Sequence, residues 1–408
     1  MYTNDSISSG KVIFKNDSPQ KILQLRFPNF DDNWQEVKLK DITNINPKTS
    51  EIPNSFYYID LESVNSGKLI NKNKIDKKNA PSRAQRLLQK NDILFSSVRP
   101  YQQNNLIFKF DNDSYVASTG FIQIRSDISN INYLYYYLHT HSFLNKVLRF
   151  CTGSNYPTIS SNDLKNIKIK IPTIQEQEKI GTFLSKIDGK IALMEKKQEE
   201  LEIFKKYIIN NLFNSTMIKD GWKSLPLKEF LHEHKLKSTG SEEVYSVSVS
   251  KGVVNQVEHM GRSFSAKNTD KYNLVQPDDI IYTKSPTGDF PYGIIKQSHE
   301  NKNVIVSPLY GVFKPKTKEL GYILENYFES PVHCHNYLHS LVQIGAKHTM
   351  NITNKTFLSK ELYIPVDHNE QKKIYNTLYS LNKKIELVKK EIELVNKYKR
   401  GLIQKMFI

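Results

Sequence analysis

The sequence predicts an α+β fold in which two similar globular domains are each followed by a long α-helix, with the two helices packed as an antiparallel coiled coil. Three observations lead to this prediction. Residues 176–213 align without a gap with residues 370–407. Both segments repeat apolar residues in alternating steps of four and three, as coiled coils do. Short runs that alternate apolar and polar residues, typical of strands, precede each helix.

The repeat divides the chain into five segments. We predict a flexible N-terminal arm at residues 1–24, a first domain at 25–170, a first helix at 171–216, a second domain at 217–363 and a second helix at 364–408. The first segment is polar and lacks the apolar stretch of a secretory signal. We therefore expect a mobile arm and not a targeting segment.

The two predicted domains share a skeleton. Trp34 and Leu39 of the first domain correspond to Trp222 and Leu227 of the second. In each domain a strand after an acidic turn, a second strand, a helical stretch and a loop follow in the same order. These elements lie at 91–95, 115–118, 131–148 and 153–156 in the first domain, and at 278–282, 304–307, 320–341 and 345–348 in the second. Most other residues differ, which indicates a duplication followed by divergence in specificity.

Each long helix begins with a predicted capping box, Thr173 with Glu176 and Asp367 with Glu370. The first side chain accepts from a free backbone N–H, and the glutamate reaches back. A single apolar stripe of this length needs a partner helix, and the other copy is the obvious one, although a second chain is an alternative. The apolar residues of the coiled-coil stripe are Ile180, Leu184, Ile187, Ile191, Met194, Leu201, Ile208, Leu212, Ile374, Leu378, Leu381, Ile385, Val388, Ile392, Val395, Leu402 and Met406.

The formal net charge of +16 favours a polyanionic partner such as nucleic acid. The basic excess lies mainly in residues 1–170 and 365–408, while residues 220–364 are almost neutral. No run of 18 apolar residues occurs, so no membrane-spanning helix is expected. Cys151 and Cys334 offer neither a disulfide framework nor a zinc pattern. A cytoplasmic protein is the simplest interpretation.

Motifs for catalysis are weak. Residues 289–292 are the nearest stretch to the pocket of an adenine methyltransferase, but they have a single proline and no glycine-rich cofactor turn accompanies them. The phosphate-binding loop of NTPases is also missing. We therefore expect no catalytic residue, no cofactor and no metal. Two alternatives stay open: a metal-dependent DNA nuclease using Asp278, Glu300 and Lys302, and a coiled-coil interaction protein without a DNA role.

Several motifs carry a family resemblance. The first half contains LRFPNFDDNWQEVKLKDI (25–42), NDILFSSVRP (91–100), YVASTGFIQIR (115–125) and GSNYPTISSNDLKNIKIKIPTIQEQEKIGTFLSKIDGKI (153–191). The second half contains weaker counterparts in WKSLPLKEF, DDIIYTKSP and NEQKKIYNTLYSLNKKIELVKKEI, and it departs from the pattern where it reads VSPLYGV in place of STGF. On these motifs the chain resembles, over nearly its whole length, the specificity subunit of a type I restriction–modification enzyme.

The resemblance implies two target-recognition domains, each reading one half of a bipartite site in double-stranded DNA, and a helix pair that acts as a spacer between them. It also implies a non-catalytic subunit that holds two adenine methyltransferase subunits and, through them, the restriction subunits. Lys205 and Lys399 occupy the same polar step of the stripe. We expect these two residues to mark where the helices separate or contact the methyltransferase subunits.

Basic stretches and loops supply the candidate DNA contacts. Lysine suits phosphates, arginine can bind guanine through two hydrogen bonds, and glutamine can pair with adenine. Arg83 and Arg86, three apart on a possible helix face, are better candidates for base reading than the lysines before them. The candidates in the first domain are Lys72, Lys74, Lys77, Lys78, Arg83, Arg86, Arg99, Tyr101, Gln102, Gln103, Asn155 and Tyr156, and those in the second are Lys251, Arg262, Lys284, Lys347 and His348.

Overall fold

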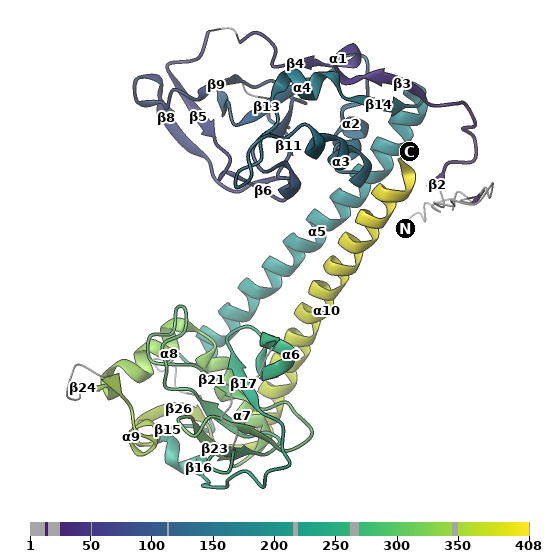
Figure 1. The fold of residues 1–408 in the computed structure, drawn as a ribbon. Helices are drawn as coiled ribbons and strands as arrows, with labels where there is room; N and C mark the ends of the chain where they lie inside the picture. The colour runs from purple at the N-terminus through teal and green to yellow at the C-terminus, as the bar shows by residue number, and fades with distance from the viewer. Residues whose placement is uncertain are drawn as a thin grey trace, which may run out of the picture. The chain divides into compact units, whose positions relative to one another are not determined.

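The computed structural model describes residues 13–14, 25–49, 51–111, 114–214, 219–261, 269–344 and 350–407 (Figure 1). The chain forms two compact units. Unit 1 consists of Met1–Glu195 with Lys390–Ile408, and unit 2 consists of Lys196–Lys389. The two long helices, α5 (Ile174–Leu212) and α10 (His368–Met406), therefore each contribute to both units.

Unit 1 contains two four-stranded sheets. The first has the order β11 (Leu106–Ile107), β10 (Ile93–Ser96), β13 (Phe121–Arg125) and β4 (Asn44–Ile45), and it is antiparallel throughout. The second has the order β8 (Asn73–Asp76), β5 (Ser55–Ile59), β12 (Tyr115–Ser118) and β9 (Ala84–Leu87), in which only β5 and β12 run parallel. Shorter pairs join β3 (Gln35–Lys38) to β14 (Lys168–Ile171), β6 (Val64–Asn65) to β7 (Lys68–Leu69), and β1 (Ile13–Phe14) to β2 (Leu25–Arg26).

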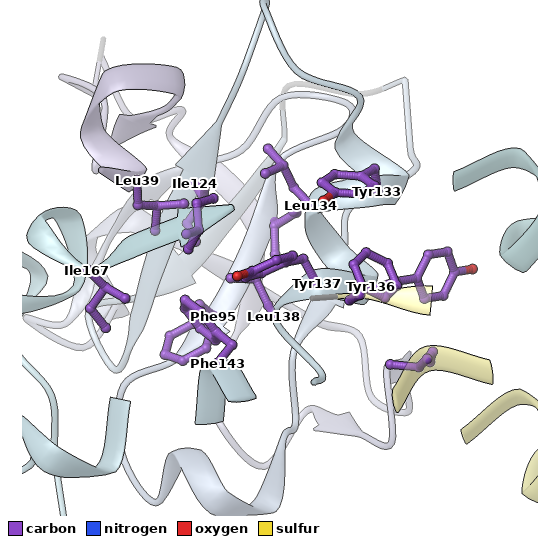
Figure 2. Close-up of a cluster of buried hydrophobic side chains, with 14 of the residues drawn as sticks. Leu39, Phe95, Ile124, Tyr133, Leu134, Tyr136, Tyr137, Leu138, Phe143 and Ile167 are labelled. Atoms are coloured by element: carbon purple, nitrogen blue, oxygen red, sulfur yellow. The ribbon is translucent and has the colours of Figure 1, made fainter. Parts of the chain in front are cut away.

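Strand β10 is buried on both faces because its side chains alternate between two hydrophobic clusters. Ile93 and Phe95 belong to the larger cluster, while Leu94 belongs to a cluster shared with the second sheet. Phe95 meets the ring of Phe143 edge to face, with 6.1 Å between centroids (Figure 2). All four side chains of β10 are buried, so exposed polar residues lie only before and after this strand.

Three of the four short helices of unit 1 start at side chains that accept from their first free N–H groups. The four helices are α1 (Leu39–Ile42), α2 (Ile131–Tyr137), α3 (His141–Arg149) and α4 (Ser161–Asn166). Asn130, Thr140 and Ser160 cap α2, α3 and α4. The single helical stretch predicted at residues 131–148 is thus two helices, because Thr140 caps a new one.

Unit 2 repeats one of these sheets, while its described residues show only strand pairs in place of the other. Its four-stranded sheet has the order β16 (Leu231–Glu233), β23 (Gly311–Pro315), β20 (Ile280–Tyr282) and β21 (Ile295–Gln297), matching β4, β13, β10 and β11. The pair β15 (Trp222–Pro226) and β26 (Glu361–Pro365) matches β3 and β14. Its remaining strand pairs are β17 (Tyr245–Ser248) with β18 (Gly252–Asn255), β19 (Asn273–Val275) with β22 (Val304–Val306), and β24 (Gln343–Ile344) with β25 (Met350–Asn351).

The helices of unit 2 are α6 (Gln256–Met260), α7 (Lys318–Phe328), α8 (Pro331–Leu338) and α9 (Asn354–Ser359). Of these, α7, α8 and α9 match α2, α3 and α4, the 3-10 helix η3 (Leu227–Glu229) takes the place of α1, and α6 has no counterpart among the described residues of unit 1. The helical stretch predicted at 320–341 also divides. Ser330 caps α8 through the N–H of His333, and Pro331 at the first position has no N–H to satisfy.

In unit 1 the two long helices run antiparallel. Asp188 of α5 pairs with Lys399 of α10 at 2.6 Å, and Lys190 pairs with Glu391 at 3.6 Å, so that the partner number falls as the α5 number rises. The apolar end of α10 is part of the same hydrophobic cluster as the first turns of α5. The cluster includes Ile180, Leu184, Leu402, Ile403, Met406 and Phe407.

In unit 2 the end of α5 and the start of α10 form the equivalent pair. Glu202 and Lys389 form an ion pair at 3.0 Å. Ile209, Ile374 and Leu378 share a buried cluster with Trp222 and with Tyr322 of α7. Along both helices, no apolar residue of the predicted coiled-coil stripe is exposed.

The long helices are 39 residues each and start later than predicted, at Ile174 and His368. Ile171 and Pro365 end the strands β14 and β26 instead. Asp367 accepts from the N–H of Glu370 at 2.8 Å, as its predicted cap requires. Glu176 does not reach back to the chain, because its buried carboxylate binds the guanidinium of Arg26 through two 2.8 Å hydrogen bonds.

A pair of glutamines at matching positions attaches each domain to its helix. Gln177 donates to the carbonyl of Pro172 and accepts from the N–H of Asn130, the cap of α2. Gln371 donates to the carbonyl of Pro365 and accepts from the hydroxyl of Thr317, the cap of α7. The repeat therefore extends to individual hydrogen bonds.

Lys205 and Lys399, the polar steps of the stripe, both form ion pairs within their units. Lys399 pairs with Asp188, which also accepts from the hydroxyl of Tyr136 on α2 at 2.5 Å. Lys205 pairs with Glu329, which follows α7. Each lysine therefore supports the packing of a domain helix against the long helices.

The Lys205–Glu329 pair belongs to a partly buried cluster of charges in unit 2. Lys296 of β21 lies 3.6 Å from Glu329 and 4.0 Å from Glu325, and His299 lies 2.7 Å from Glu325. Burial lowers the pKa of His299, but the hydrogen bond and charge of Glu325 outweigh it, so that the pKa is raised.

The helices among the described residues are each too short or too polar to cross a membrane.

The raised pKa of His299 predicts a pH-dependent stability of unit 2. The folded protein holds this proton more tightly, so the contribution is fully present below the ordinary histidine pKa of about 6.5 and is lost as pH rises through the folded value. We expect His299→Gln to lower the melting temperature more at pH 5.5 than at pH 8. The matched control is His232→Gln, an exposed histidine on β16. An equal effect of His299→Gln at both pH values would contradict the prediction.

Candidate nucleic-acid interface

The start of β10 is held by a buried carboxylate. Asp92 accepts from the backbone N–H of Gln89 at 2.7 Å, from Gln123 Nε2 at 2.7 Å, and from Arg125 Nε and Nη2 at 2.7 and 2.8 Å. The hydrogen bond to Asp92 raises the pKa of Arg125 against the opposing effect of burial. Four charge-assisted bonds on one carboxylate make this end of the strand a rigid base for the loop at its other end.

Three loops from distant parts of the sequence meet beyond the end of β10. Ser97 donates its N–H and its hydroxyl to the carbonyl of Gly120, at 3.0 and 2.7 Å, and its own carbonyl accepts from the N–H of Ile159. The N–H of Thr119 donates to the carbonyl of Arg83 at 2.8 Å. Backbone hydrogen bonds through residues 119–120 therefore connect Arg83, the segment 97–103 and the end of the loop 152–158.

The loop 152–158 is closed like a hairpin. Thr152 and Thr158 exchange backbone hydrogen bonds at 2.9 Å in both directions. Gly153 has φ +89°, and a Cβ there would lie 3.1 Å from the carbonyl oxygen of Tyr156, so glycine is required for this turn. The loop presents Asn155 and Tyr156 to solvent, and the Tyr156 side chain is 63% exposed.

Arg99 connects the β10 loop to this hairpin. Its backbone is left-handed, with φ 50°, and its N–H donates to the carbonyl of Pro157 at 2.8 Å. Its guanidinium carbon lies 4.2 Å from the centre of the Tyr156 ring, within the range of a cation–π contact. Arg99 Nε is buried without a hydrogen-bond partner among the described residues. Two predicted candidates, 57 positions apart in the sequence, thus form one stacked pair.

The three residues after Pro100 have different surroundings. Tyr101 and Gln102 are exposed in the short helix η2 (Pro100–Gln102). Gln103 donates its amide to the carbonyl of His139 at 3.2 Å, and so supports the loop against the end of α2. Tyr101 and Gln102 are available to a ligand, whereas the Gln103 side chain is used internally.

The expectation that Arg83 and Arg86 share a helix face is wrong. Arg86 lies in strand β9, which pairs with β12, and Arg83 lies in the turn before it. Residues three apart in extended chain point to opposite sides. Arg83 is exposed, while Arg86 is half-buried with its Nε unpartnered, and burial lowers the pKa of Arg86.

The four candidate lysines lie on β8 and its flanks, and all are exposed. Lys72 is 4.5 Å from the centre of the Phe110 ring, and Lys74 is 5.9 Å from that of Tyr57. Phe110, which the sequence reasoning did not select, stacks on Tyr115 at 5.3 Å. Lys77 and Lys78 lie in the short helix η1 (Lys77–Asn79). No sequence signal indicated Phe110, because its role depends on the neighbouring strands.

In unit 2 two of the five candidates can be placed. Lys284 follows β20 with φ 61°, a left-handed cation after the equivalent strand as Arg99 is in unit 1. Burial lowers the pKa of Lys284, partly opposed by Glu233. Lys251 is exposed in the turn between β17 and β18. Arg262, Lys347 and His348 lie outside the described residues.

The residues of the alternative nuclease site are engaged elsewhere. Lys302 pairs with Glu243 at 2.6 Å, and Glu300 accepts from the hydroxyl of Tyr245 at 3.4 Å. Asp278 has φ 68° and occupies the turn before β20, as Asn91 with φ 72° does before β10. Within the described ranges, no group of three His, Cys, Asp or Glu side chains is placed to hold a metal ion. This geometry gives no support to the nuclease hypothesis.

Comparison with protein families and known proteins gives a consistent set of relatives. The model of the family described as type I restriction modification DNA specificity domain matches twice, at residues 31–203 and 220–397. The chain is 26% identical over 190 residues to the HindI specificity subunit of Haemophilus influenzae, covering 44% of this chain and 41% of that protein. It is 26% identical over 193 residues to the MjaVIII specificity subunit of Methanocaldococcus jannaschii, covering 44% of this chain and 45% of that protein. The aligned region thus spans less than half the length of these two relatives.

Two solved structures share the fold. A type I restriction–modification S subunit from M. genitalium is 14% identical, with a TM-score of 0.57, and covers 93% of this chain and 98% of that one. A chain from a structure on complex assembly and conformational transition of the type I R-M system is 18% identical, with a TM-score of 0.54, and covers 92% and 98%. At these identities the likeness concerns the fold alone.

The arginines of unit 1 differ in whether a carboxylate binds them, and this difference predicts unequal effects of their replacement on stability. Arg125→Met leaves the buried Asp92 carboxylate without its cation, and we expect a loss of about 3 kcal/mol in unfolding free energy. Arg86→Met removes a half-buried cation that has no acidic partner within the described ranges, so the change should stay within about 1 kcal/mol or be stabilising. Thermal and denaturant unfolding of the two variants measures both. A large loss in Arg86→Met would show that this arginine has a structural role.

Proposed function

Because the chain belongs to the type I restriction modification DNA specificity domain family, we propose that it is the DNA sequence-recognition subunit of a type I restriction–modification complex. The observation that carries the proposal is the double match of the family model, once on each recognition domain with its long helix. The subunit itself is proposed to be non-catalytic. It guides an adenine methyltransferase to a site, and the methyltransferase flips the base out of the duplex.

Each domain is proposed to read one half of a bipartite site in double-stranded DNA. In unit 1 the supporting feature is the surface formed by Arg83, Arg99, Asn155 and Tyr156, with the lysines of β8 for phosphates. In unit 2 the equivalent position after β20 carries Lys284. Residues that differ between two copies of one scaffold would read two unrelated half-sites.

The partners are proposed to be two adenine methyltransferase subunits and, through them, restriction subunits, acting on DNA in the cytoplasm. The long helices offer docking positions, because several of their large apolar side chains are exposed. These are Leu193, Ile203, Phe204 and Tyr207 on α5, and Leu387, Leu394 and Tyr398 on α10. A protein of this kind would bury them only in its complex.

Mapping adenine methylation tests the proposal. Cells carrying this chain with its methyltransferase should methylate a bipartite motif with two unrelated halves separated by unspecified bases. Cells carrying the methyltransferase alone are the control and should lack this motif. Methylation without a bipartite pattern would reject the proposal, as would DNA cleavage by the purified chain with Mg²⁺ alone.

The helix pair is proposed to set the gap between the half-sites. Inserting one heptad after Glu195 and one after Lys389 preserves the four-three stripe in both helices. Seven helical residues add about 10.5 Å, which is about three base pairs at 3.4 Å per base pair. We expect methylation mapping to show a gap longer by about three base pairs with the same half-site bases. Altered half-site bases would contradict this division of roles, and insertion into one helix alone serves as the mismatched control.

A further inference from the structure

We propose that Arg99 reads a guanine in the half-site recognised by unit 1, and that Tyr156 is the positioning residue that holds the Arg99 guanidinium in its reading orientation. This inference rests on the proposed function and adds to it the identity of one base and of the side chain that selects it. It is built on the Arg99–Tyr156 pair, which joins two loops that lie far apart in the sequence.

The backbone of Arg99 is fixed from both sides. Its left-handed conformation, with φ 50°, places the side chain at the start of η2. Its N–H is bound to the carbonyl of Pro157, and the preceding Val98 forms a bridge with Thr158. The Arg99 backbone is therefore anchored to the loop that carries Tyr156. Its side chain has little conformational freedom left to lose on binding.

The Arg99 guanidinium has the features of a donor kept for a ligand. Arg26 and Arg125 each bind a buried carboxylate through two nitrogens. Within the described part of the chain, the Arg99 guanidinium makes no such hydrogen bond or ion pair. It instead lies 4.2 Å from the centre of an aromatic ring that is 63% exposed. The Arg99 guanidinium lies beside an exposed ring and its N–H donors bind no acceptor of the described chain. It is therefore placed to bind an acceptor that a ligand supplies.

The stacked geometry favours a base over a phosphate. A phosphate contact needs charge and tolerates many orientations, which the flexible lysines Lys77 and Lys78 already provide. A planar guanidinium held against a ring presents two parallel N–H donors in a defined plane, and guanine offers the matching pair of acceptors, O6 and N7, in the major groove. Among the residues that the structure describes, no aromatic ring lies beside the Arg83 guanidinium, and Arg86 is half-buried in its sheet. Of Arg83, Arg86 and Arg99, Arg99 is therefore the one best prepared for bidentate recognition.

The test compares four variants of the subunit in complex with its methyltransferase, using methylation of a DNA library in which every half-site position is randomised. Wild type should require a G·C pair at one position of one half-site. Arg99→Lys, which keeps the charge and loses the planar donor pair, should lose about 10- to 100-fold of the discrimination at that position alone. Arg99→Ala should do the same with weaker overall methylation. Tyr156→Phe should retain the preference and Tyr156→Leu should weaken it at the same position.

The outcomes separate the inference from the proposed function. If Arg99→Ala reduces methylation of all sequences equally and Arg99→Lys restores it, Arg99 contacts a phosphate, and the inference is overturned while the proposed function stands. The inference also falls if neither half-site requires a G·C pair, or if Tyr156→Leu behaves as wild type. If the wild-type complex shows no bipartite preference, the proposed function itself fails. Matched melting temperatures for the variants and wild type exclude unfolding as the cause.

Discussion

The burial of the C-terminal helix end in the core of the first domain is the constraint on which unit 1 depends. Leu402, Met406 and Phe407 share one hydrophobic cluster with Tyr133 of α2 and Ile180 of α5. Each such side chain stabilises the fold by about 1.5–3 kcal/mol when removed from water. The core of the first recognition domain is therefore completed by the last turns of α10, more than two hundred positions after the end of that domain.

The two units keep the same scaffold while changing its chemical partners. A buried aspartate precedes the central strand in both, as Asp92 before β10 and Asp279 before β20. Asp92 is held by Arg125 and Gln123, whereas Asp279 accepts from His234 Nε2 at 2.7 Å. The scaffold requires a donor opposite this carboxylate but not a particular residue type. Such tolerance lets the loops beyond the strands diverge without loss of the fold.

The arginines of unit 1 fall into two groups by whether a carboxylate binds them. Arg26 and Arg125 lie against buried carboxylates, and each neutralises a charge that would otherwise be costly in the interior. Arg86 and Arg99 have buried Nε atoms without partners among the described residues. Stability alone does not favour such an arrangement, and unsatisfied groups of this kind concentrate where a ligand completes them.

The sequence by itself determined the duplication, the long helices with their apolar stripes and the order of elements in each domain, because period and spacing are local properties that folding preserves. It also identified Arg99 and Tyr156 as separate candidates, but it placed Arg83 and Arg86 on a possible helix face where the structure has a turn and a strand, since strand pairing with β12 overrides local pattern. Only the tertiary structure decided that Arg99 stacks on Tyr156, that Phe110 lies under Lys72, and that Glu176 binds Arg26 in place of its cap. Those contacts join residues far apart in the chain, and no local spacing encodes them.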